Sequence, residues 1–206
     1  SGEASILQKN KNKDICKAEW RKYSYPQEGI EPLIHRPVVI GCGPAGMFCT
    51  YMLAELGYRP ILLERGADVD TRCQDVEHFW ETGELDTRSN VQFGEGGAGT
   101  FSDGKLNTLV KDPMGRNHKV LEIFVSNGAS EEILYRNKPH IGTDVLAKVV
   151  KNMRKKILAN GGNVHFYSQV TDFTFENGKI TGLTVTDTRN RKEYRLDAET
   201  IVLAIG

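Results

Sequence analysis

The chain has 206 residues, a length that usually corresponds to one domain or slightly more. Its charge is balanced, with 27 Lys and Arg against 27 Asp and Glu, so composition gives no support for a nucleic-acid or acidic-membrane partner. The sequence contains no run of about 18 apolar residues and therefore predicts no transmembrane helix. The four cysteines form no CxxC pair and no metal-ligand spacing, which favours free thiols in a reducing cytoplasm.

Residues 1–36 are rich in polar side chains and show little periodicity, which is typical of a linker or N-terminal arm. They also lack the apolar centre of a secretion signal. We expect a domain of α/β class over residues 37–206, with a parallel sheet covered by helices.

Residues 38–66 carry the strongest pattern in the chain, VVIGCGPAGMFCTYMLAELGYRPILLERG. An apolar strand runs into the glycines at positions 41, 43 and 46, and a helical pattern follows. Gly41 permits a tight turn, Gly43 leaves the backbone open to a diphosphate, and Gly46 lets the helix pack closely on the strand. The helix N-terminus then offers unpaired N–H groups to the phosphates.

A second apolar strand ends in Glu64, at the distance from the glycines where an acid binds a ribose. The carboxylate can accept hydrogen bonds from the ribose diol, and it would repel a 2′-phosphate. A lone GxGxxG is a weak signal, but this complete strand–turn–helix–strand–acid unit predicts a site for the ADP half of a dinucleotide.

Further along the chain, apolar side chains recur at helical spacing over residues 70–82, 118–127 and 144–158. The third of these helices has an apolar stripe formed by Leu146, Val149, Val150, Met153 and Ile157. A glycine-rich loop at residues 94–104 lies between the first two helices. Its glycines suit a close approach to a ligand, whereas a mobile surface loop is the alternative.

From residue 163 the apolar period changes from helical to that of a strand. Strands are expected over residues 169–175, 179–187 and 191–197, and the Asn177-Gly178 pair predicts a hairpin between the first two. These strands would form a small antiparallel insertion at about residues 169–197. The last run, TIVLAIG, is continuously apolar and predicts a buried parallel strand that returns to the main sheet.

Together these motifs resemble the glutathione-reductase-type FAD-binding fold and, more narrowly, a bacterial FAD-dependent dehydrogenase family related to the NAD(P)/FAD-dependent oxidoreductases. The resemblance covers about residues 37–206. It rests on the first glycine motif, on FGEGGAGTFSDGKL, on KPHIGTD at 138–144 and on TIVLAIG. The first motif is shared by a very large superfamily, and the second and third are narrower.

The resemblance implies a Rossmann-like FAD-binding domain in which each motif has a role toward the cofactor. The first loop would hold the FAD pyrophosphate, Glu64 the adenosine ribose, and Arg65 would lie near the adenine. Val170, the residue before the small sheet, would meet the adenine through its backbone. The implied cofactor-binding residues are Gly41, Gly43, Pro44, Ala45, Gly46, Glu64, Arg65, Gly97, Ala98, Gly99, Thr100, Ser102, Val170, Ala204 and Gly206.

The resemblance implies an FAD-dependent oxidoreductase of dehydrogenase type, acting on a small molecule with NAD(P)H as a candidate electron donor. Members of the family continue past the TIVLAIG strand with a Gly-Asp motif and a substrate domain, so we expect this chain to be a fragment of a longer enzyme that is inactive alone. No residue is assigned as catalytic. His140 and the pair Asp103 and Lys105 are candidates near the flavin, with a structural role as the alternative.

Two other interpretations stay open. One is an NAD-binding dehydrogenase with a single Rossmann fold, which the second glycine loop and the β insertion disfavour. The other is a flavin-binding module of an RNA-modifying or sensing protein, which the lack of a basic, aromatic-interleaved patch disfavours. No metal site is predicted, and the sequence leaves the substrate and the oligomeric state open.

Overall fold

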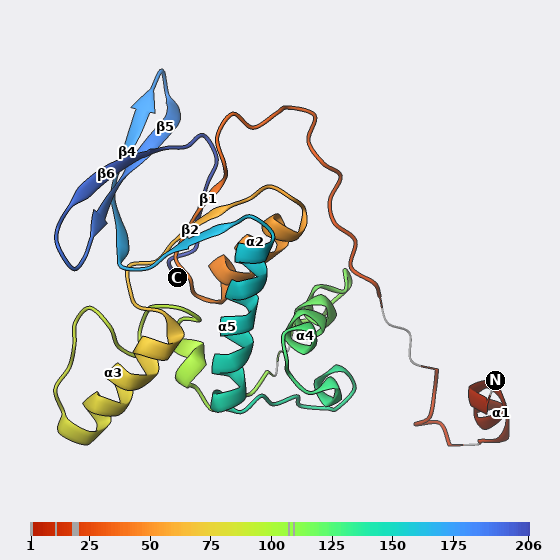
Figure 1. Ribbon diagram of the computed structural model, residues 1–206. Coiled ribbons are helices and arrows are strands. Elements are labelled where there is room, and N and C mark those ends of the chain that lie inside the picture. Colours follow the sequence, from red (N-terminus) through yellow and green to blue (C-terminus); the bar gives the residue numbers. More distant parts are fainter. Residues whose placement is uncertain (1, 11, 18–20, 107, 109) are drawn as a thin grey trace.

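The computed structural model describes residues 2–10, 12–17, 21–106, 108 and 110–206 (Figure 1). Its helices are α1 (Gly2–Lys9), α2 (Pro44–Glu55), α3 (Val69–Thr82), α4 (Arg116–Ser126) and α5 (Thr143–Ala159), with 3-10 turns η1 (Ala98–Phe101) and η2 (Glu131–Leu134). Its strands are β1 (Val38–Ile40), β2 (Ile61–Leu63), β3 (Asn163–His165), β4 (Ser168–Glu176), β5 (Lys179–Asp187), β6 (Glu193–Asp197) and β7 (Ile201–Leu203).

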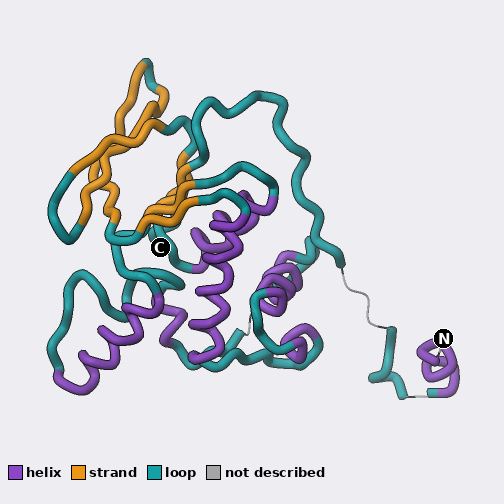
Figure 2. The backbone as a smooth tube through the Cα atoms, in the orientation of Figure 1, coloured by secondary structure: helices purple, strands orange, loops and turns teal. Residues whose placement is uncertain are grey.

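The strands form two separate sheets (Figure 2). The first has the order β3-β2-β1-β7, and all of its neighbouring pairs are parallel. The second has the order β4-β5-β6 and is antiparallel. This arrangement is the predicted α/β class, a Rossmann-like fold with a small antiparallel β insertion.

The parallel sheet lies between two apolar layers, because successive side chains of a strand point to opposite faces. Val39 belongs to the core formed with α2, α4 and α5, whereas Val38 and Ile40 pack on the opposite face. That opposite face is covered by Leu183 and Val185 of β5. The β insertion therefore packs on the main sheet from the side opposite α2 and α5.

The amphipathic helix predicted at 144–158 is α5, and its whole predicted stripe is buried. The other two predicted helices are also present, as α3 and α4. On α4, Ile123 is buried in the core, and Leu121, Phe124 and Val125 pack against the same core. On α3, Trp80 is 66% exposed, so only part of the apolar pattern of that helix contributes to the core.

The predicted hairpin at Asn177-Gly178 connects β4 to β5. Both residues have positive φ, +50° and +75°, which is the geometry that the Asn-Gly pair favours in a two-residue hairpin. The segment also begins with an additional strand, β3, which was not among the predicted strands. It pairs with β2 and so belongs to the main sheet.

The strand predicted at 201–206 is β7, and its parallel pairing with β1 confirms its return to the main sheet. Its predicted burial is wrong, because Leu203 is 61% exposed. β7 is the edge strand of the sheet, so one side of it has no neighbouring strand within the described residues. A continuous apolar run therefore predicted the pairing but not the exposure.

The segment interpreted as an arm contains α1, a helix that the sequence analysis did not predict. Nearer the domain, the Glu199 carboxylate accepts hydrogen bonds from the amides of Ile34 and His35. The Arg36 guanidinium donates to the carbonyls of Pro60 and Gly161. These contacts fix the chain where it enters β1.

Candidate functional site

A cavity of about 660 Å³ opens at the carboxyl ends of β1, β2 and β7. This edge of a parallel sheet is where doubly wound folds bind ligands. The cavity is lined by Ile40, Gly41, Gly43, Pro44, Ala45, Leu63, Glu64, Arg65, Gln92, Phe93, Gly94, Gly97, Ala98, Ser168, Gln169, Val170, Ala204, Ile205 and Gly206.

The first glycine loop connects β1 to α2 and lines the cavity with bare backbone. A Cβ at Gly41 would lie 2.4 Å from the carbonyl oxygen of Ala204, and Gly41 has a φ of +98°. A Cβ at Gly46 would lie 1.8 Å from the carbonyl oxygen of Gly41. These two glycines are therefore required by packing, and Gly46 lies beneath the cavity surface instead of lining it.

Gly43 differs from its two neighbours in the motif. A Cβ added there would meet no atom within 4 Å, because it would stand in the cavity itself. Gly43 is also the N-cap of α2 and provides no side-chain cap, so the first turn of the helix keeps unpaired N–H groups. The bare backbone at Gly43 and the unpaired N–H groups of α2 together form an anion cradle. A side chain at position 43 would fill this cradle.

Glu64 lies at the end of β2, and its side chain is 4% exposed at the cavity wall. One carboxylate oxygen accepts a hydrogen bond from the Cys42 amide at 2.7 Å, and the other accepts from the Gly66 amide at 2.8 Å. Each oxygen has a second lone pair, so the carboxylate retains capacity for a ligand hydroxyl. Its orientation is fixed by backbone on both sides.

The second glycine loop reaches the same cavity from the opposite side. The Gly96 amide donates to the Cys42 carbonyl at 2.8 Å, and a Cβ at Gly97 would lie 3.1 Å from the Cα of Gly43. Gly97 and Ala98 line the cavity. The two loops, distant in sequence, therefore meet across a single anion cradle.

The other three residues expected from this loop do not line the cavity. Thr100 is 1% exposed, and its hydroxyl has no hydrogen-bond partner among the described residues. Ser102 donates to the Gly99 carbonyl at 2.8 Å within the turn η1. The structure thus separates the loop into a part that faces the cavity and a part that anchors the turn.

The remaining wall is formed by residues that the sequence analysis named only in part. The Arg65 guanidinium lies 4.2 Å from the centre of the Phe93 ring, and both side chains line the cavity. Val170 also lines it, but it lies within β4 and not before the small sheet, because β4 begins at Ser168. Gln92 and Gln169 were missed, since an isolated glutamine carries no periodic or motif signal.

Behind the second loop, the buried carboxylate of Glu95 accepts a hydrogen bond from the Val69 amide at 2.7 Å. Its other oxygen lies 3.3 Å from the Arg154 guanidinium. Burial raises the pKa of Glu95 to about 7, against the opposing effects of these two partners. Burial likewise raises the pKa of the Cys42 thiol well above its usual range, so this thiol is neutral and unreactive at pH 7.

All four cysteines are free thiols, as expected from their spacing. No group of three or more His, Cys, Asp or Glu side chains that could hold a metal ion occurs within the described residues. Among the helices of that same part of the chain, none combines the length and apolar character needed to cross a membrane.

The second and third motifs of the sequence analysis meet in space. Lys105 forms an antiparallel bridge with His140, and the His140 ring lies 2.8 Å from the Asp103 carbonyl oxygen. Asp103 and Lys105 form an exposed ion pair at 2.8 Å. None of the three lines the cavity of the glycine loops.

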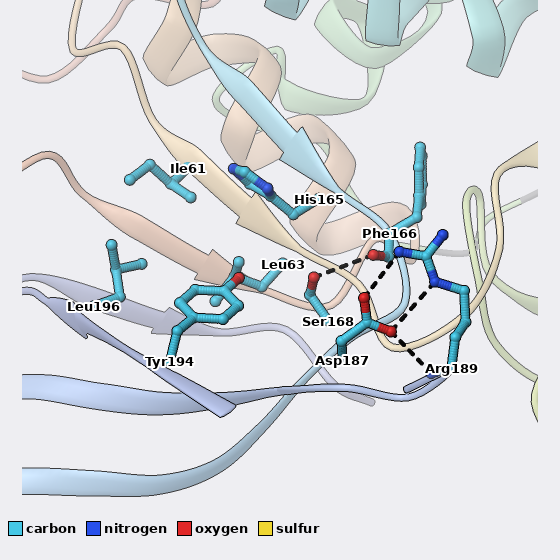
Figure 3. Close-up of a pocket in the computed structure, with 9 residues that line it drawn as sticks. All are labelled: Ile61, Leu63, His165, Phe166, Ser168, Asp187, Arg189, Tyr194 and Leu196. Carbon is cyan, nitrogen blue, oxygen red and sulfur yellow. Dashed lines mark hydrogen bonds and ion pairs between the residues drawn. The ribbon is translucent and has the colours of Figure 1, made fainter. Parts of the chain in front are cut away.

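A smaller cavity of about 310 Å³ lies between the main sheet and the β insertion (Figure 3). Several of its polar groups are already paired. Arg189 donates to the Asp187 carboxylate at 2.8 Å, and the Ser168 hydroxyl donates to the Phe166 carbonyl. Burial lowers the pKa of His165, which lines the same cavity, and favours its neutral form. Ser168 and Leu63 line both cavities.

No family model matches the chain. A protein of Clostridium beijerinckii described only as uncharacterized is 47% identical over 204 residues, which cover 99% of this chain and 37% of that protein. The chain therefore spans little more than a third of the length of this relative.

Solved structures with the same fold include three proteins at low sequence identity. Glycine oxidase of Bacillus cereus superposes with a TM-score of 0.53 at 15% identity, over 84% of this chain and 55% of the other. THI4 of Thermovibrio ammonificans superposes with a TM-score of 0.52 at 18% identity, over 82% of this chain and 56% of the other. The 3-ketosteroid dehydrogenase of Rhodococcus jostii, in complex with 4-androstene-3,17-dione, superposes with a TM-score of 0.52 at 12% identity. The match covers 90% of this chain and 48% of the other. These likenesses define the fold class.

Proposed function

We propose that this chain is the FAD-binding part of an FAD-dependent oxidoreductase. The observation that carries the proposal is the open backbone at Gly43, which lies against Gly97 in the cavity that the fixed carboxylate of Glu64 also lines. Bare backbone with unpaired amides suits a diphosphate, and a carboxylate suits a ribose diol. Two of the structures that share the fold are, by name, an oxidase and a dehydrogenase.

In this proposal each wall of the cavity binds one part of the cofactor. The first turn of α2 and the Gly97–Ala98 backbone bind the diphosphate, and Glu64 binds the adenosine ribose. Arg65 and the Val170 backbone border the adenine, and Ala204 and Gly206 lie toward the remainder of the cofactor. The flavin, when bound, supplies the two-electron chemistry, and the protein binds, orients and shields it.

FAD is favoured over NAD because of which segments complete the cavity. The classic NAD fold binds its dinucleotide across two βαβαβ halves. Here the lining beyond the first βαβ unit comes instead from the second glycine loop and from strand β4 of the β insertion. The Glu64 carboxylate at the cavity wall would repel a 2′-phosphate, which further favours FAD over an NADP-type nucleotide.

The substrate and the overall reaction belong to the longer protein, given the 37% share of the relative that this chain covers. We propose a small-molecule substrate with NAD(P)H as a candidate electron donor. Free thiols at all four cysteines favour a reducing cytoplasm. The chain alone is proposed to bind cofactor without turnover.

A direct test is titration of the purified chain with FAD, FMN, NAD and NADP by isothermal calorimetry, with flavin fluorescence as a second signal. The proposal predicts saturable FAD binding that is stronger than NAD, NADP or FMN binding. Preference for NAD over FAD would favour the single-Rossmann dehydrogenase. Absence of binding by all four nucleotides would contradict the proposal.

A further inference from the structure

Arg72 of α3 is fully buried, and no carboxylate of the described residues forms an ion pair with it. Its guanidinium instead makes five hydrogen bonds to backbone carbonyls of the second glycine loop and of the residues just before it. The acceptors are the carbonyl oxygens of Asn90 (two bonds), Val91, Glu95 and Gly97. Five bonds equal the full donor capacity of a guanidinium, so no donor of Arg72 is left unpaired.

The loop is shaped around this side chain. A Cβ at Gly94, which has a φ of +108°, would lie 2.4 Å from the Arg72 Cδ. The Phe101 ring covers one face of the guanidinium, with its centre 4.9 Å from the Arg72 Cζ. The guanidinium is therefore held in its plane by carbonyls and above its plane by an aromatic ring.

The orientation of these carbonyls determines where the neighbouring amides point. In a trans peptide the C=O and the following N–H point in opposite directions. The Glu95 carbonyl binds Arg72, and the Gly96 amide correspondingly donates to Cys42 in the first loop. The Gly97 carbonyl also binds Arg72, at 3.1 Å, so the Ala98 amide is directed away from Arg72.

The Ala98 amide has no hydrogen-bond partner among the described residues, and Ala98 lines the cavity. Gly97, which precedes it, is in contact with Gly43 of the first loop. The free amide therefore lies beside the anion cradle formed by the N-terminus of α2. It can donate to the same anion from the opposite side of the cavity.

We propose that Arg72 is a positioning residue that turns the Ala98 amide toward the diphosphate of the bound dinucleotide. Arg72 does not touch the ligand and acts through the Gly97–Ala98 peptide. This inference rests on the proposed function, because it assigns a diphosphate to the cavity. It adds a specific donor, and the buried cation that orients it, to the binding site.

The test uses the 206-residue chain and compares ADP with adenosine, which lacks the diphosphate. Affinities are measured by displacement of a fluorescent ADP derivative, and folding is checked by circular dichroism and thermal unfolding. Arg72→Lys removes the planar fork while keeping the charge. We expect its ADP affinity to fall about 10- to 100-fold, the size expected for loss of a hydrogen bond to a charged group, with adenosine affinity unchanged. Arg88 is exposed and paired with Asp86, and Arg88→Lys is the matched control that should change neither affinity.

A second variant addresses the amide directly and leaves Arg72 in place. Ala98→Pro removes the N–H at the first residue of η1, where proline breaks no bond within the turn. We expect the proline variant to lose ADP affinity while retaining adenosine affinity.

Equal losses for ADP and adenosine in a folded Arg72→Lys variant would show a purely structural role and overturn the inference. Unchanged ADP affinity in that variant, or in Ala98→Pro, would also overturn it. If Arg72→Lys does not fold, Ala98→Pro decides. A wild-type chain that binds neither FAD nor ADP overturns the proposed function as well, whereas wild-type binding with unaffected variants overturns this inference alone.

Discussion

The Glu64 carboxylate accepts a hydrogen bond from the Cys42 amide at 2.7 Å, which joins the end of β2 to the glycine loop that follows β1. The Gly66 amide binds the other oxygen at 2.8 Å. The side chain is therefore held in one orientation before any ligand is present. Such preorganisation reduces the entropy that binding must overcome.

Replacement of Glu64 by Gln should weaken nucleotide binding and relax its selectivity. A neutral amide retains the shape of the side chain, but its NH₂ group faces a backbone N–H, at a cost of about 1–3 kcal/mol in folding free energy. The repulsion of a 2′-phosphate is lost as well. We expect a smaller ratio between the dissociation constants of 2′-phospho-ADP-ribose and ADP-ribose, measured by calorimetry.

The exposed variant Glu28→Gln is the control for this experiment. An unchanged selectivity ratio in Glu64→Gln would contradict the role of Glu64 at the ribose.

Gly46→Ala should destabilise the fold itself. Its Cβ would overlap the Gly41 carbonyl oxygen, which is backbone and has no room to move. We expect a loss of roughly 2–4 kcal/mol in the free energy of unfolding, measured by urea denaturation, as for other overpacked sites. Gly99→Ala, whose Cβ would meet no atom within 4 Å, should stay within about 0.5 kcal/mol of wild type.

The buried Glu95 should make stability depend on pH near neutrality. Its pKa in the folded state is about 7, above the ordinary glutamate value of 4.5, so between these values the folded chain binds more protons than the unfolded chain. The contribution of Glu95 to stability is therefore fully present below about pH 4.5 and is lost as the pH rises through 7. The change amounts to on the order of 3 kcal/mol from the size of the shift.

Glu95→Gln isolates this effect, because other carboxyl groups titrate equally in both proteins. The difference in unfolding free energy between wild type and Glu95→Gln should favour wild type more at pH 4.5 than at pH 8. A difference that is constant over this range would contradict the raised pKa.

Local patterns in the sequence were sufficient to predict most of the fold. The stripe of α5 and the Asn177-Gly178 hairpin each follow from a short period or a dipeptide with one preferred geometry. The exposure of Leu203 was not predictable, because an apolar run reports that a strand pairs but not whether another strand flanks it. Burial at a sheet edge depends on tertiary neighbours.

The site was predictable where a motif fixes backbone geometry and not where distant segments meet. Gly41, Gly43 and Glu64 follow from one contiguous unit. Arg72 lies on a helix among polar residues, and no sequence signal distinguishes it from an exposed arginine. Its role depends on carbonyls 18 to 25 positions further along the chain, which only the folded loop brings together.

Gly43→Ala tests the central claim most directly, with Gly99→Ala as its matched control. Both glycines would accept a Cβ without contact to protein atoms, so both variants should fold as wild type, but only the Cβ at position 43 stands in the cavity. The account predicts that Gly43→Ala loses FAD binding by at least about tenfold in calorimetry, as expected when a side chain blocks the approach of a diphosphate to backbone amides, while Gly99→Ala binds FAD normally. FAD binding of wild-type strength by a folded Gly43→Ala variant would contradict it.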